Sequence, residues 1–131
     1  MQNYDLKNEV LKVRNVLEII HKELDPPYFK NFPKGTCGDT SDLLAQWLIE
    51  KGFDNVKCVC GQKNGEPHAW LELNDLIIDI TSDQFDDGLS PVYIGRNRDF
   101  HDTFNKQNST EPIIPPYLTD AYKQFHRLMH L

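Results

Sequence analysis

The pattern of apolar and polar residues divides the chain into helical and extended segments. Apolar residues recur at three- and four-residue steps over about residues 5–24, which predicts an amphipathic helix that ends at Asp25-Pro26-Pro27. A second helix is predicted over residues 37–51, with Gly52 following its last turn. Residues 118–131 predict a closing helix. Its N-cap is expected to be Thr119, and its buried residues are expected to be Tyr122, Phe125 and Met129.

Between the second and third helices the pattern favours strands. The segment 53–61 contains the β-prone run Val56 to Cys60, which predicts a strand. Residues 91–94 predict one more short strand. Residues 68–73 and 76–80 flank Asn74-Asp75, which predicts a hairpin with a two-residue turn. The other segments are expected to be turns and loops, namely 28–35, the polar turn 62–67, the acidic loop 82–90 and the covering loop 95–116.

The hairpin pattern also predicts a register. If Leu73 faces Leu76, one face of the hairpin is entirely apolar, and a slip by one residue would mix the two faces. On this register His68 and Asp79 share the other face and are diagonal neighbours, which is within reach of an imidazole–carboxylate hydrogen bond. The apolar face consists of Ala69, Leu71, Leu73, Leu76, Ile78 and Ile80.

Cys37 is predicted at the first position of the second helix. Thr36 and Asp39 have capping-box spacing, with Thr36 as the N-cap. The unpaired backbone N–H groups and the dipole of a helix N-terminus stabilise a thiolate. Leu44 and Leu48 follow Cys37 by 7 and 11 residues and so share its face of the helix. We therefore expect the thiol to face inward.

Together these residues form a candidate catalytic triad. Cys37 would be the nucleophile, His68 the general base and then acid, and Asp79 the group that orients the imidazole. The backbone N–H of Cys37 is the first candidate oxyanion donor, and Asn31 is a candidate for the second. The predicted chemistry is acyl transfer from an amide through a thioester.

The motifs Gly35-Thr36-Cys37-Gly38, His68-Ala69-Trp70 and Asp79 resemble the core of the transglutaminase-like branch of the papain-like cysteine enzymes. The resemblance covers about residues 32–82 of a single domain, 1–131. It implies an α+β fold in which a cysteine-bearing helix packs on a small antiparallel sheet, and the helices predicted at both ends of the chain would flank this core. It also implies a cysteine peptidase, amidase, deamidase or transglutaminase acting on a protein or peptide. Among these reactions we expect hydrolysis. Gly38 and Trp70 are the candidate substrate-binding residues, and no calcium requirement is implied.

Composition restricts partners and location. The chain has 131 residues, 14 Lys and Arg against 20 Asp and Glu, and a formal net charge of −6. We find no basic stripe interleaved with aromatics, so a nucleic-acid partner is not expected. No apolar run approaches the roughly 18 residues that span a bilayer, so a membrane partner is not expected either. Three cysteines and no targeting segment favour a reducing compartment, the cytoplasm. No cofactor is expected.

Other interpretations stay open at this point. Zinc held by Cys37, Cys58, Cys60 and His68 is a rival site, although Cys-x-Cys departs from usual zinc spacing. Cys58 and Cys60 are expected to pack in a strand, and Trp70 either shields the site or fills a second small core. A non-catalytic module that binds a peptide in the same groove is the alternative function. Surface roles are expected for His21, His101, His126 and His130, and a solvated loop or an acidic rim is expected for Asp83, Asp86 and Asp87.

Overall fold

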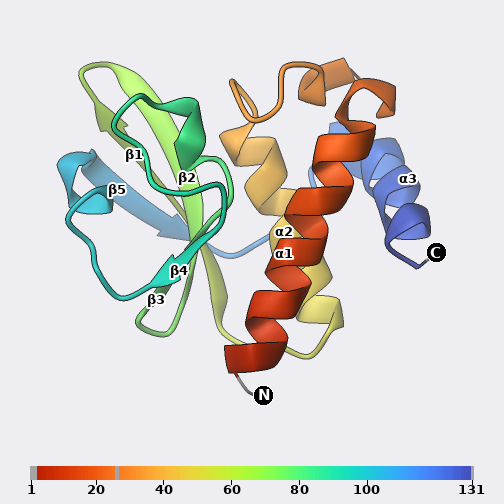
Figure 1. The fold of residues 1–131 in the computed structure, drawn as a ribbon, viewed down its shortest axis with the longest axis horizontal. Helices are drawn as coiled ribbons and strands as arrows, with labels where there is room; N and C mark the ends of the chain where they lie inside the picture. Colours follow the sequence, from red (N-terminus) through yellow and green to blue (C-terminus); the bar gives the residue numbers. More distant parts are fainter. Residues whose placement is uncertain (1–2, 26, 131) are drawn as a thin grey trace.

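A layer of helices lies against one face of a β-sheet in the computed structural model, which describes residues 3–25 and 27–130 (Figure 1). This described part contains three α-helices and five strands. The helices are α1 (Asn3–Ile20), α2 (Cys37–Glu50) and α3 (Thr119–Met129). The strands are β1 (Val56–Lys63), β2 (Glu66–Leu73), β3 (Leu76–Asp79), β4 (Tyr93–Gly95) and β5 (Asn105–Thr110). Short 3-10 turns are η1 (His21–Glu23), η2 (Pro27–Phe29), η3 (Ser82–Gln84), η4 (His101–Thr103) and η5 (Pro116–Leu118).

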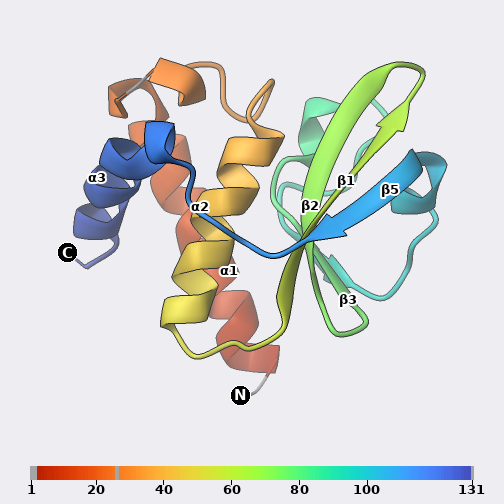
Figure 2. The ribbon, with the colours of Figure 1, turned by 180° about the vertical axis from the view of Figure 1, so that it is seen from behind.

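Helix α2 is the element that joins the two layers. It packs directly on β1 and β2, whereas α1 and α3 cover its other sides. The connection after β5 crosses α2 to reach α3, as Figure 2 shows. The apolar stripe predicted for the first helix is buried, with Val10, Val13 and Leu17 fully enclosed. In residues 3–25 and 27–130, no helix has both the length and the hydropathy needed to cross a membrane.

The sheet is antiparallel throughout and has the order β4-β3-β2-β1-β5. The predicted hairpin register is confirmed, because Leu73 pairs with Leu76 and Leu71 with Ile78. Asn74 takes a positive φ of 57° in the turn, a conformation that asparagine tolerates better than most residues. The hairpin register places His68 and Asp79 on the face of the sheet that points away from α2. Helices and an antiparallel sheet together make this an α+β fold.

That opposite face has a small apolar core of its own. It consists of Val59, Trp70, Ile77 and Phe104 and is covered by the segment from η3 to β5. Trp70, which is 1% exposed, therefore fills a second core, one of the two roles considered for it. The larger core lies between the helices and the other face of the sheet.

Several local expectations were wrong. The turn between β1 and β2 is only Asn64-Gly65, with φ of 53° and 81°, so the strands run through most of the expected polar turn. The expected covering loop contains β5, a wholly exposed polar strand that pairs with β1. The third helix begins at Thr119, and its N-cap is Leu118.

The capping box at the second helix is also absent. Thr36 is the N-cap, but its hydroxyl donates to the Pro33 carbonyl at 3.2 Å. The Asp39 carboxylate instead accepts a hydrogen bond from the Tyr117 hydroxyl at 2.7 Å. As a result, neither side chain of the predicted box occupies the N–H groups of the first turn of α2.

Candidate functional site

Cys37 occupies the first residue of α2, as the sequence predicted. Its side chain is half-buried, and the loop before it reaches η3, where the Gly35 N–H donates to Gln84 Oε1 at 3.5 Å. The N-terminal end of α2 and η3 therefore lie at the same end of the molecule (Figure 1). This places the thiol beside the start of β2, where His68 lies.

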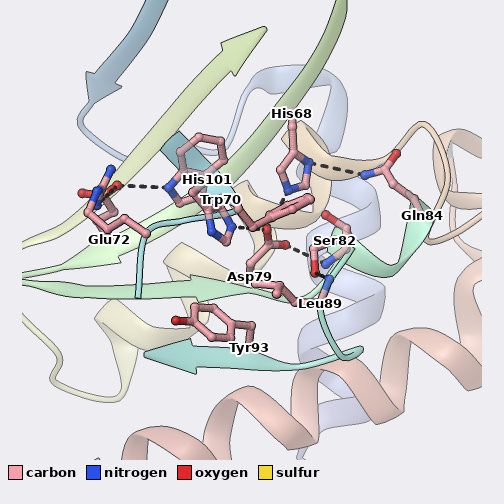
Figure 3. Close-up of polar contacts among 12 residues, drawn as sticks. His68, Trp70, Glu72, Asp79, Ser82, Gln84, Leu89, Tyr93 and His101 are labelled. Atoms are coloured by element: carbon pink, nitrogen blue, oxygen red, sulfur yellow. Dashed lines mark hydrogen bonds and ion pairs between the residues drawn. The ribbon is translucent and has the colours of Figure 1, made fainter. Parts of the chain in front are cut away.

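His68 and Asp79 form a buried pair in the middle of the sheet (Figure 3). His68 Nε2–H donates to Asp79 Oδ2 at 2.6 Å, and both side chains are fully shielded from solvent. The ionised carboxylate is only an acceptor, so the proton of a neutral His68 must be on Nε2. Nδ1 is then the nitrogen that can accept a proton, and it faces Gln84 Nε2 at 3.4 Å.

The charge state of His68 is set by these neighbours. Burial acts to lower the pKa of His68, but the hydrogen bond to Asp79 and the interaction with Cys37 outweigh it and raise the pKa to about 9. A His68 that stays protonated near neutral pH can stabilise a Cys37 thiolate as an ion pair. The structure thus brings together all three residues of the predicted triad.

Asp79 is held as a carboxylate by three donors. Burial acts to raise its pKa, but the hydrogen bonds from His101 and His68, with that from the Thr81 backbone, lower it to about 2. Thr81 N–H donates to Oδ1 at 2.9 Å, whereas both histidines donate to Oδ2. Asp79 therefore stays charged over the whole range in which proteins normally work.

His101 was wrongly expected at the surface. It is fully buried in η4, and its Nε2–H donates to Asp79 Oδ2 at 2.7 Å. The one clue in the sequence is the pair Phe100 and Phe104, which surround His101 with aromatic residues in an otherwise polar segment. Of the other histidines, His21 Nδ1 contacts the Lys30 carbonyl at 2.9 Å, and His126 and His130 lie against Trp47.

A metal ion is a poor fit to this group. The ligand atoms of His68, Asp79 and His101 do lie within 4.8 Å of one another. However, zinc–ligand distances of about 2.0–2.1 Å would hold nitrogen and oxygen ligands about 3 Å or more apart. The observed nitrogen–oxygen distances of 2.6 and 2.7 Å are those of charge-assisted hydrogen bonds. The nitrogens also point at the carboxylate oxygen itself.

The two remaining cysteines lie away from the triad. Cys58 is half-buried against α2, with its sulfur 3.9 Å from Asp42 Oδ1. Burial and the Asp42 carboxylate raise the pKa of the Cys58 thiol to about 12. Cys60 is exposed on the same strand. Because His68 faces the opposite side of the sheet, these cysteines do not join it in the zinc site considered above.

The candidate oxyanion and substrate-binding residues differ in where they lie relative to the triad. The Cys37 N–H stands at the helix start as predicted, whereas the Asn31 side chain is exposed in the preceding turn. Gln84 is the residue that brings a side-chain amide to His68. Gly38 is exposed with open space around it, and buried Trp70 donates its indole N–H to Glu72 at 3.0 Å. Gly38 is thus accessible to solvent, and Trp70 packs against both histidines.

Arg14 is a further residue that the sequence reasoning missed. Its guanidinium donates to the Ile80 carbonyl at 2.6 Å and to both carboxylate oxygens of Asp83 at 2.9 and 2.8 Å. It also lies over the Phe32 ring, 4.8 Å from the centroid, in the loop before Cys37. Arg14 therefore ties the segment after Asp79 to the helix layer. Asp83 belongs to this ion pair, and Asp87 pairs with Lys63, so neither is simply a free loop charge.

Comparisons with known proteins do not assign this chain to a family. Searches against protein-family models, curated proteins and solved structures gave no match. The resemblance to transglutaminase-like enzymes stays a prediction from the motifs.

Proposed function

We propose that this protein is a thiol-dependent acyl-transfer enzyme that acts on an amide bond of a protein or peptide. The observation that carries the proposal is the buried His68–Asp79 pair, in which His68 has a raised pKa of about 9 because of Asp79 and Cys37. A nucleophilic thiol requires a base close by and a third group that orients that base. Cys37, His68 and Asp79 meet these requirements in the order helix, strand and adjacent strand, which supports a papain-like core of the transglutaminase-like type.

The proposed reaction begins with attack of the Cys37 thiolate on the carbonyl carbon. The carbonyl oxygen becomes an oxyanion beside the Cys37 N–H at the start of α2. When the tetrahedral intermediate collapses, the C–N bond breaks and His68 gives its proton to the leaving amine. The thioester that remains is then attacked by water or by an amine, which loses its proton to His68. Release of the acid or the new amide restores the Cys37 thiolate and the protonated His68.

Cysteine reactivity against pH tests the proposal. We expect iodoacetamide to label Cys37 at pH 6, because His68 is protonated there and an adjacent imidazolium activates a thiol. Cys58 should stay unlabelled even at pH 8, because burial and Asp42 raise its pKa to about 12. Peptide mapping resolves the three sites, and His68→Ala should slow Cys37 labelling. Cys60→Ser is the matched control, since Cys60 is exposed and away from His68.

Two results would contradict the proposal. One is Cys37 labelling that is slow at pH 6 and unchanged in His68→Ala. The other is low-pH labelling of Cys37 without formation of a thioester from any activated acyl donor, which would favour the non-catalytic peptide-binding module instead. Incubation with p-nitrophenyl acetate and mass spectrometry of the Cys37 peptide separates the two functions.

A further inference from the structure

His101 is the second histidine on the Asp79 carboxylate. Its Nε2–H donates to Oδ2 at 2.7 Å, and this is the same oxygen that accepts from His68 at 2.6 Å (Figure 3). The two imidazole rings are near-parallel, 28° apart, with centroids separated by 6.1 Å. One carboxylate oxygen is therefore shared by two buried histidines.

Packing alone does not explain a histidine at this position. The ring is enclosed by aromatic side chains, with Trp70 edge-on at 4.7 Å, Tyr93 stacked at 5.8 Å and Phe100 edge-on at 5.1 Å. His101 Nδ1 is buried and has no hydrogen-bond partner among the described residues. A buried polar atom without a partner is unfavourable, and a phenyl ring would fill the same space without that cost. What the imidazole adds over a phenyl ring is the bond to Asp79.

The segment that carries His101 is firmly held. The Gln107 side-chain amide donates to the carbonyls of His101 and Phe104 at 2.9 and 3.2 Å. Arg98 links Gln107 to Glu72 on β2, where Glu72 also accepts from the Trp70 indole. These bonds fix η4 over the sheet, so His101 is placed on Asp79 by the fold.

We propose that His101 is a positioning residue for the acyl transfer inferred above and acts through Asp79, because its Nε2–H takes up part of the hydrogen-bonding capacity of the oxygen that binds His68. The proposal rests on the proposed function of Cys37 and His68. A donor on Oδ2 draws electron density from the oxygen that binds His68, so His68 holds its proton less tightly than it would with Asp79 alone. A histidine that releases its proton more readily is a better acid for the leaving amine.

Loss of His101 should therefore strengthen the His68–Asp79 bond. Asp79 would stay in place, because Thr81 N–H still holds Oδ1 and His68 still holds Oδ2. The titratable groups that face these rings are Cys37 and Asp79 at His68, and Asp79 and Tyr93 at His101. Three more charged residues lie further out. Glu72 accepts a hydrogen bond from the Trp70 indole, Arg98 donates to Glu72, and Lys63 lies over the Phe100 ring. The His101 ring itself also faces the His68 ring, so His101→Gln, which removes the ring but keeps a donor for Asp79, separates the bond to Asp79 from a direct effect of the ring.

The test is a titration of His68 by long-range ¹H–¹⁵N NMR in wild type, His101→Phe and His101→Gln. The Phe variant keeps the ring and removes the donor, whereas the Gln amide can place an N–H where His101 Nε2 was. We expect the His68 midpoint to rise by about one pH unit in His101→Phe, the size expected for one hydrogen bond to a charged group. His101→Gln should keep the wild-type midpoint. In wild type the same spectra should show His101 with its proton on Nε2.

Equal His68 midpoints in wild type and His101→Phe would overturn the proposal, even if the melting temperature falls, because a purely structural role predicts that result. A downward shift would overturn it as well, since Asp79 would then have left His68. If His101→Phe does not fold, a His101 that carries its proton on Nδ1 in wild type would be decisive against it. Iodoacetamide labelling of Cys37 in the same wild-type sample tests the proposed function separately. An unreactive Cys37 beside a responsive His68 would refute the function and leave the link through Asp79 intact.

Discussion

Asp79→Asn is the most informative single change at the site. The amide has almost the size of the carboxylate, so size alone predicts an undisturbed fold. The hydrogen bonds predict otherwise, because the carboxylate accepts from His68 and His101 on one oxygen and from Thr81 N–H on the other. An asparagine offers one oxygen and one NH₂ group, so in either orientation a donor faces a donor.

The magnitude follows from the charge state of His68. Its ordinary pKa is 6.5, and in the fold it is raised to about 9, with Asp79 as the strongest of the raising influences after burial has acted to lower it. That difference corresponds to about 3 kcal/mol favouring the imidazolium. If most of it is lost, the protonated fraction of His68 falls by about 30-fold at pH 8, whereas at pH 6 His68 stays mostly protonated in both proteins. This fall is smaller than the roughly 10⁴-fold loss for the same change in a serine protease.

Stability should change with pH in a defined direction. A raised His68 pKa contributes stability that is complete below pH 6.5 and is lost as the pH rises through about 9. A lowered Asp79 pKa contributes stability that is complete above pH 3.8 and is lost as the pH falls through about 2. The stability advantage of wild type over Asp79→Asn should therefore be greatest between pH 4 and 6.5. There the melting temperature should differ by about 10 °C, and the difference should shrink above pH 9.

Two measurements check this prediction. Iodoacetamide labelling of Cys37 at pH 8 reports the loss of the His68 imidazolium, and thermal unfolding at pH 5, 7 and 9.5 gives the stability. Asp86→Asn is the matched control, because Asp86 is exposed on the loop after η3. Asp83→Asn is unsuitable, since Asp83 forms an ion pair with Arg14. Suppose that Cys37 in Asp79→Asn is labelled at the wild-type rate and that the difference in melting temperature does not vary with pH. Asp79 would then only end a strand.

Two further predictions concern the scaffold and the metal question. Arg14→Met should lower the free energy of unfolding by about 3 kcal/mol, because it leaves the Asp83 carboxylate and the Ile80 carbonyl without the partner they have in the fold. Denaturant unfolding measures this loss. In the control Arg96→Met, which removes an exposed ion pair, the free energy of unfolding should fall by at most about 0.5 kcal/mol. An equal loss in the two variants would show that Arg14 does not have the assigned role. Elemental analysis of the purified protein should find far less than one zinc per chain, since the histidines bond to the carboxylate. About one ion per chain that is lost in His101→Ala would instead make this group a metal site.

Local patterns in the sequence were enough to predict most of the fold. The helix stripes and the hairpin register are short-range features, because a one-residue slip would bury polar side chains throughout. That register alone put His68 and Asp79 on one face, and it is confirmed by the pairing of Leu73 with Leu76. The placement of Cys37 at a helix start was likewise predicted from its neighbours.

Strand β5 could not be predicted in this way. Its six residues are polar and exposed, so they carry no apolar alternation. The strand is held by backbone hydrogen bonds to β1, with a register shift between Cys60 and Gln62. Such pairing depends on an available edge, which exists only once β1 and β2 have formed.

The position of Arg14 in the sequence indicates that it is buried with a partner. It lies four residues after Val10 and three before Leu17, which puts a charge on the buried stripe of α1. A charge in that position requires a partner, and the partner proved to be Asp83, 69 residues away.

The sequence by itself determined the helices, most of the strands, the hairpin register and the candidate catalytic residues, since each of these depends on neighbours within a few positions. Only the tertiary structure decided which polar groups meet. It set His101 on Asp79, brought Gln84 to His68, placed Arg14 on Asp83 and kept Cys58 and Cys60 away from the triad. The physical reason is that hydrogen bonds and ion pairs depend on distances of a few ångströms between segments far apart in the chain, and a polar side chain does not specify its partner.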